Sequence, residues 1–112
     1  MRAVKTTPET TELEELARLA LDGNREALES LIGALQGDVF GIALRMLGNR
    51  EDAEDATQEI LIRIVTRLSQ FDFRSKLKTW AYRIAVNCVL DFQRSPAQKQ
   101  KRNFQQLGAA IV

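Results

Sequence analysis

The side chains of this 112-residue chain best suited to chemistry form a polar stripe near its C-terminal end. At about 100° per residue, five polar side chains of the 76–94 segment fall within about 80° of one another, opposite the apolar residues of that segment. They are Lys76, Thr79, Arg83, Asn87 and Arg94. These residue types contact the phosphates and base edges of nucleic acids. The stripe therefore predicts a nucleic-acid-binding face, although the solvated side of an ordinary amphipathic helix has a similar composition.

The charge distribution agrees with that prediction. The net charge is only +1, but residues 1–40 carry four basic and eight acidic side chains, whereas residues 69–112 carry eight basic and two acidic ones. Such asymmetry indicates that the C-terminal third meets a polyanion. The alternative is a solvated surface whose charge is merely uneven.

Aromatic residues lie close to this polar stripe, which is called the basic stripe below because of Lys76, Arg83 and Arg94. Phe71 and Phe73 precede it, and Trp80 lies at its edge. Aromatic rings beside basic groups stack on unpaired bases, which stabilises binding by about 1–3 kcal/mol per base. Core packing is the alternative for Phe71 and Trp80, whereas Phe73 stands in a polar stretch between Asp72 and Arg74.

A second candidate surface lies earlier in the chain. On a helical wheel of residues 50–68, several side chains point away from the apolar face, among them Asp55, Gln58, Glu59 and Ile62. An apolar residue in the middle of a polar face predicts a docking surface for a protein, although single exposed apolar residues are also common.

Catalytic and metal-binding patterns are missing. The chain has no histidine and a single cysteine, Cys88, so a histidine-based triad and a His or multi-Cys metal cage are excluded. No glycine-rich phosphate loop occurs, and the acidic cluster at residues 51–55 lacks the spacing of a calcium loop. We expect no enzyme activity, cofactor or metal, and we expect Cys88 to be a buried structural residue.

Four helices must position these residues. Capping and glycine signals place them at residues 11–22, 25–47, 50–68 and 76–94, with N-cap signals at Asn24 and Ser75 and a capping box from Thr11 to Glu14. No sustained two-residue alternation indicates a sheet. The sequence predicts an all-α fold, a compact bundle of about four helices. Glycines at 33, 37 and 41 either break the second helix or permit close packing.

The length supports one domain of ordinary size. We expect a flexible N-terminus at residues 1–10, a helical domain at 11–95, and a linker or frayed tail at 96–112. No uninterrupted apolar stretch approaches the ~20 residues of a membrane span, and the first residues do not resemble a secretory signal. We therefore expect a cytoplasmic location and no membrane span.

Two motifs resemble a known family. The stretch ALRMLGNREDAEDATQE, at residues 43–59, resembles region 2 of bacterial sigma factors of the extracytoplasmic-function (ECF) group. The stretch FDFR, at residues 71–74, followed by KTWAYRIAVN, at residues 78–87, resembles the same region. The motifs occur in the family's order, and the likeness covers roughly residues 24–94.

The resemblance implies a fold of the sigma region 2 type and a role in transcription initiation without chemistry of its own. It implies that Asp55, Gln58 and Glu59, around the exposed Ile62, dock on the β′ clamp helices of RNA polymerase core. It also implies that the 71–75 loop holds a base flipped from the non-template strand of the promoter minus-ten element, and that the fourth helix approaches the DNA. The implied DNA-binding residues are Phe71, Asp72, Phe73, Arg74, Ser75, Lys76, Thr79, Trp80, Arg83, Asn87 and Arg94.

Further partners and alternatives stay open at this point. An anti-sigma factor is a further partner of such a domain. Family members usually continue into a second, helix-turn-helix domain called region 4, and we expect none within residues 96–112. A helical adaptor that binds polymerase or an anti-sigma factor without reading DNA would need only the surface around Ile62. A nonspecific nucleic-acid-binding domain would need only the basic stripe.

Overall fold

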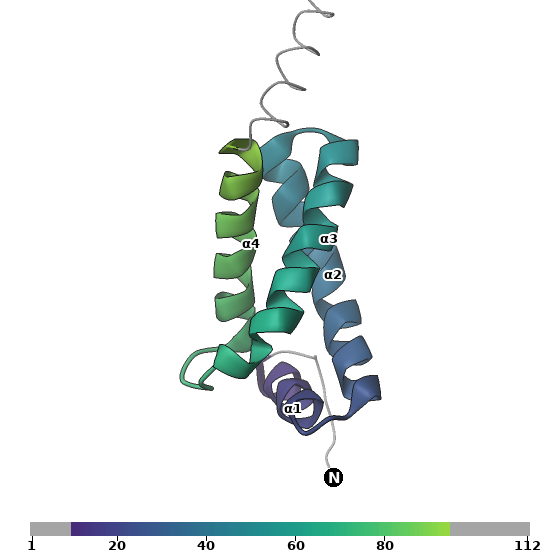
Figure 1. Cartoon of the computed structure of the whole chain (residues 1–112), viewed down its shortest axis with the longest axis vertical. Coiled ribbons are helices and arrows are strands. Elements are labelled where there is room, and N and C mark those ends of the chain that lie inside the picture. Colours follow the sequence, from purple (N-terminus) through teal and green to yellow (C-terminus); the bar gives the residue numbers. More distant parts are fainter. Residues whose placement is uncertain (1–9, 95–112) are drawn as a thin grey trace, which may run out of the picture.

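The computed structural model describes residues 10–94, which form four α-helices and one short 3₁₀ helix (Figure 1). They are α1 (Thr10–Leu21), α2 (Arg25–Leu47), α3 (Arg50–Arg67), η1 (Leu68–Gln70) and α4 (Leu77–Arg94). No strand occurs within residues 10–94, which confirms the predicted all-α class. Apart from Thr10, the predicted flexible N-terminus lies outside the described residues, as does the predicted tail at 96–112.

Three helices run side by side and the fourth crosses their end. Figure 1 shows α2, α3 and α4 along the long axis, with α1 lying across the end at which α3 leads into η1. α1 contacts α2, α4 and η1. The turn between η1 and α4 consequently comes to lie beside α1, although about 50 residues separate them in the sequence.

Local sequence sets the boundaries of the two central helices. The side-chain carbonyl of Asn24 accepts a hydrogen bond from the Ala27 N–H at 3.0 Å, and that of Asn49 accepts one from the Asp52 N–H at 2.8 Å. Gly48 ends α2 with a φ of 70°, and its N–H donates to the carbonyl of Leu44 at 2.8 Å. Asparagine N-caps and a left-handed glycine C-cap satisfy backbone groups that the helices themselves leave unpaired.

α2 is continuous through its glycines, so the predicted break does not occur. A Cβ atom added at Gly33 or Gly37 would meet no atom within 4 Å, so no helix approaches closely there either. By length and composition α2 is also long and apolar enough to cross a membrane, although charged residues interrupt it and it contains no continuous apolar stretch of that length. Core helices have the same composition, and α2 buries Leu31, Leu35 and Val39 in this bundle.

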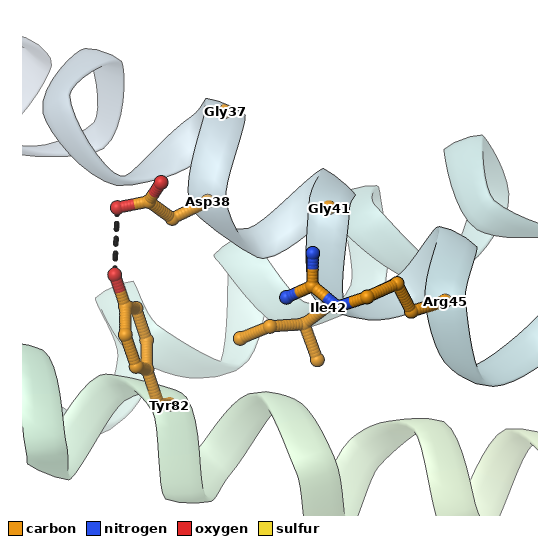
Figure 2. Close-up of a pocket in the computed structure, with 6 residues that line it drawn as sticks. All are labelled: Gly37, Asp38, Gly41, Ile42, Arg45 and Tyr82. Carbon is orange, nitrogen blue, oxygen red and sulfur yellow. Dashed lines mark hydrogen bonds between the residues drawn. The ribbon is translucent and has the colours of Figure 1, made fainter.

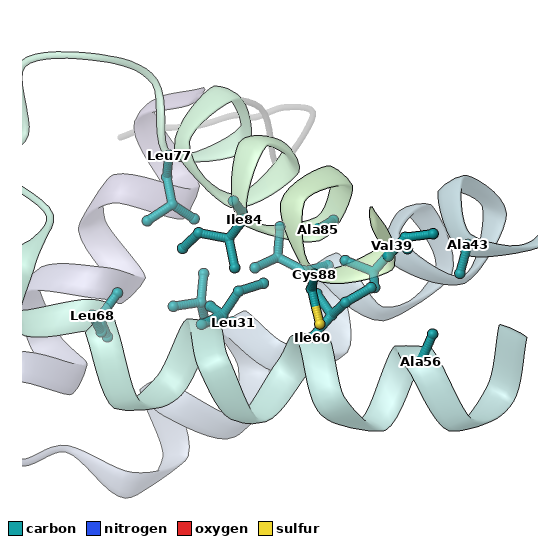
Figure 3. Close-up of a cluster of buried hydrophobic side chains, with 14 of the residues drawn as sticks. Leu31, Val39, Ala43, Ala56, Ile60, Leu68, Leu77, Ile84, Ala85 and Cys88 are labelled. Atoms are coloured by element: carbon teal, nitrogen blue, oxygen red, sulfur yellow. The ribbon is translucent and has the colours of Figure 1, made fainter. Parts of the chain in front are cut away.

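The core lies between the long helices. Figure 3 shows side chains of α2, α3 and α4 meeting there, including Leu31, Ile60 and Cys88. The buried hydroxyl of Thr57 donates to the carbonyl of Ala53 at 2.7 Å, which satisfies a polar group inside the core. Cys88 is only 1% exposed, which confirms its predicted burial, and this burial raises the pKa of its thiol.

The start of α4 differs from its prediction. The helix begins at Leu77, and the acceptor for the Leu77 N–H is the Oε2 atom of Glu14, at 2.5 Å, rather than Ser75. Glu14 was expected to cap its own helix, but α1 begins one residue earlier than predicted and directs this carboxylate to α4. A carboxylate from a distant helix therefore stabilises the helix that carries the basic stripe.

Candidate nucleic-acid and protein interface

The polar stripe lies on the exposed side of α4. Thr79, Arg83, Asn87 and Arg94 are exposed, as is Lys76 just before the helix. Within residues 10–94, the three basic members of the stripe form no ion pair. Unpaired basic groups are free to neutralise phosphates. Three of the eight basic residues counted in the C-terminal third, Lys99, Lys101 and Arg102, lie outside the described residues.

Two apolar side chains interrupt this exposed side of α4. Val86 and Leu90 stand one turn apart and are 37% and 36% exposed. On the helical wheel both residues fall among the polar side chains of the stripe, away from the apolar side of the helix. The α4 surface is therefore partly apolar.

The segment at residues 71–76, here called the aromatic loop, joins η1 to α4. Phe71 is only 3% exposed, and its ring centroid lies 4.7 Å from that of Phe73 and 5.3 Å from that of Trp80. The structure thus corrects one expectation, since Phe71 belongs to the core and supports its neighbours instead of offering a surface to a base. Trp80 is half-buried against Phe71.

Phe73 occupies an unusual position. Its φ is 63°, the only positive value for a non-glycine residue in the described part of the chain. One face of its ring is covered by Arg18, whose Cζ atom lies 4.7 Å from the ring centroid. Phe73 therefore does not present both faces to solvent, as an open stacking platform would.

The other loop residues are exposed. The N–H of Arg74 donates to the Oδ1 atom of Asp72 at 3.1 Å, a short-range bond that shapes the turn. The side chains of these two residues also approach to 3.9 Å, and both are largely in solvent. Ser75 is exposed as well. The loop therefore brings Asp72, Arg74 and Ser75 to the surface, close to the start of the basic stripe.

The predicted protein-docking residues lie together on α3. Asp55, Gln58, Glu59 and Ile62 are all exposed, and Ile62 is 57% exposed. Gln58 also borders an open hollow of about 330 Å³ between α2 and α3, together with Phe40 and Arg50. The helical wheel of residues 50–68 could not include Phe40, because Phe40 belongs to α2 and not to α3.

Arg63 connects this surface to α4. Its guanidinium lies 3.1 Å from an Asp91 carboxylate oxygen and 3.9 Å from one of Glu59. The hydrogen bond to Asp91 raises the pKa of Arg63 above its ordinary value. This link joins α3 to α4 beside the predicted docking residues.

A polar contact between α2 and α4 borders a further hollow of about 230 Å³. Figure 2 shows Asp38 and Tyr82 pointing toward each other, with Arg45 nearby. The Tyr82 hydroxyl donates to Asp38 at 2.6 Å, and Lys78 lies 3.9 Å from the same carboxylate. Burial first, and then this hydrogen bond, raise the pKa of Tyr82 to about 12.

Candidate metal ligands do not gather. Among residues 10–94, no group of three or more His, Cys, Asp or Glu side chains is placed to hold a metal ion.

The comparisons with known proteins give one consistent result. The family model for Sigma-70 region 2 matches residues 31–99. The chain is 36% identical over 69 residues to the ECF RNA polymerase sigma factor SigW of Bacillus subtilis, which covers 62% of this chain and 37% of that protein. It is 38% identical over 76 residues to the ECF RNA polymerase sigma factor SigC of Mycobacterium tuberculosis, with 68% and 40% covered.

A third relative is more distant. The chain is 30% identical over 74 residues to the RNA polymerase sigma-H factor of Pseudomonas aeruginosa, with 66% of this chain and 38% of that protein covered. The matches thus span about two fifths of the length of these curated relatives.

Proposed function

Because the chain belongs to the Sigma-70 region 2 family, we propose that it docks on bacterial RNA polymerase core and recognises and melts the promoter minus-ten element. The relatives named above are RNA polymerase sigma factors, which supports polymerase as the partner. In this proposal the chain performs no catalysis and acts in the cytoplasm, where polymerase works.

The DNA side of the proposal rests mainly on one observation. Lys76 belongs to a loop that carries an aromatic residue in a strained backbone conformation, and the unpaired basic groups of Arg83 and Arg94 continue from it along α4. Phosphate contacts give affinity, whereas contacts to bases give specificity. The basic stripe supplies the phosphate contacts. The exposed Asp72, together with Phe73, supplies the contacts to bases.

The polymerase side rests on the α3 surface. Asp55, Gln58 and Glu59 are exposed around Ile62, which is itself more than half exposed. Exposed apolar side chains ringed by polar ones are typical of protein interfaces. We place the β′ clamp helices of polymerase on this surface. An anti-sigma factor that competes with polymerase would cover the same residues.

A pull-down on RNA polymerase core, with and without promoter DNA, tests this function. The proposal predicts that the chain is retained by polymerase alone and that the assembly retains DNA carrying a minus-ten element better than a scrambled duplex. Retention by polymerase without any preference for DNA favours the adaptor. Retention on both DNA molecules alike, without binding to polymerase, favours the nonspecific nucleic-acid binder.

A further inference from the structure

α1 holds the aromatic loop at two points. The carboxylate of Glu14 accepts the hydrogen bond of the Leu77 N–H, where the loop passes into α4. One turn further along α1, the guanidinium of Arg18 lies over the ring of Phe73, in the middle of the loop. Arg18 is itself paired with Glu15 at 3.4 Å. A helix near the N-terminus thus contacts both the centre and the end of a loop that follows it by about 50 residues.

The contact of Glu14 supplies a hydrogen-bond acceptor at the start of α4. The first N–H groups of a helix have no partner within that helix, and Leu77 is completely buried, so water does not reach it easily. A carboxylate at this end also interacts favourably with the helix dipole. Glu14 therefore fixes the point from which α4 starts and at which the aromatic loop ends.

The contact of Arg18 restrains Phe73 within the aromatic loop. A positive φ is unfavourable for a phenylalanine and persists only where the surroundings hold the residue in place. The surroundings of Phe73 are the ring of Phe71, which is fixed in the core, and the guanidinium of Arg18. A cation over an aromatic face is attracted to it and restrains the ring.

We infer that α1 is the positioning element of the aromatic loop, with Glu14 and Arg18 as the residues that hold it in the shape that selects a base. The selection of a base rests on the proposed function, whereas the restraint of the loop does not. Neither residue lies within residues 31–99, the part of the chain that matches the family model. Restraint by α1 is a property of this chain's own contacts.

The restraint is measurable without DNA, by amide hydrogen exchange across residues 72–77. Glu14→Ala should accelerate exchange of the Leu77 amide by about tenfold or more, since a hydrogen bond to a charged acceptor is lost. Glu14→Gln, which keeps a carbonyl acceptor, should restore part of the protection. Arg18→Ala should accelerate exchange in the loop itself, and Arg18→Lys should restore part of it.

Glu12→Ala is the matched control, because Glu12 is an exposed carboxylate of the same helix and forms no ion pair or hydrogen bond with its side chain in the described part of the chain. Exchange of α2 and α3 core amides should stay at the parental rate in every variant, which separates loosening of the loop from loss of fold. Parental exchange at residues 72–77 in both Glu14→Ala and Arg18→Ala would overturn the inference.

Binding of labelled single strands tests the consequence for base selection. Arg18→Ala should reduce the preference for a minus-ten strand over a scrambled strand by about threefold or more, with little change in affinity for the scrambled strand. Equal loss of affinity for both strands, with unaltered exchange, would make Arg18 a phosphate contact and contradict its positioning role. If the parent shows no preference at all, the proposed function fails, and the exchange rates alone decide whether α1 restrains the loop.

Discussion

Tyr82 illustrates how a single polar side chain joins two helices of this bundle. Its hydroxyl spans from α4 to Asp38 of α2 and remains protonated well beyond its ordinary range, because burial and the carboxylate both disfavour the phenolate. The folded chain binds this proton more tightly than the unfolded chain does. The stabilisation of the folded chain by the protonated Tyr82 hydroxyl is therefore complete below pH 10 and is lost as the pH rises toward about 12.

Tyr82→Phe removes this titration. The wild type should exceed the variant in unfolding free energy by about 1 kcal/mol at pH 8, and this difference should shrink between pH 10 and 12. Urea denaturation of both proteins across that range measures it, and comparing the two cancels the titration of the lysines. A difference that stays constant to pH 12 would contradict the assigned role of the hydroxyl.

Cys88 makes a second prediction at this scale. It lies in the core, and its raised pKa keeps the thiol protonated near neutral pH, whereas alkylating reagents attack the thiolate. Labelling of the native protein at pH 7.5 should therefore be slow and should become rapid in denaturant. Rapid native labelling would show that α4 does not bury this side of the helix.

At the scale of elements, the glycines within α2 make this helix less stable than alanine at the same positions would. Gly33 is exposed in a continuous helix, and a Cβ atom there would meet nothing. Gly33→Ala should raise the unfolding free energy by about 1 kcal/mol. Gly48→Ala is the control with the opposite sign, because the φ of 70° at that position disfavours a side chain. Denaturant midpoints report both changes, and destabilisation by Gly33→Ala would argue against an open site.

The α3 surface carries the prediction for the polymerase partner. The double substitution of Gln58 and Ile62 by Ala should weaken binding to RNA polymerase core, yet change the unfolding free energy by no more than about 0.5 kcal/mol, since both are exposed. Affinity measurements test this surface. The control is the double substitution of two exposed α2 residues, Glu29→Ala and Ser30→Ala. Parental affinity in the Gln58 and Ile62 variant would exclude this docking site.

Sequence patterns predicted these elements well, because the signals are local. Asn24 caps the helix that follows it, as predicted, and the apolar spacing in α4 placed Cys88 inside and Arg83 outside. Phe71 was harder to assign, because an aromatic residue in a short connection is compatible both with core packing and with binding a base. Only its contacts with Phe73 and Trp80 decide between them.

At the scale of the whole molecule, the relations between distant elements could not be predicted. Periodicity indicates which face of a helix is buried but not which partner covers it, so the bond from Glu14 to the Leu77 N–H left no signal in the sequence. The same is true of Arg18 over Phe73. These contacts unite the N-terminal helix, the aromatic loop and the basic stripe into one unit.

The most direct test of the central claim is fluorescence anisotropy of a labelled non-template strand with the chain bound to RNA polymerase core. We predict that a strand with a minus-ten sequence binds at least about tenfold more tightly than a scrambled strand, and that Asp72→Ala changes this preference. Lys76→Ala should weaken both strands alike and reduce the salt dependence by about 0.7 in logarithmic slope. Equal affinity for both strands in the parent and in both variants would contradict promoter reading by this domain.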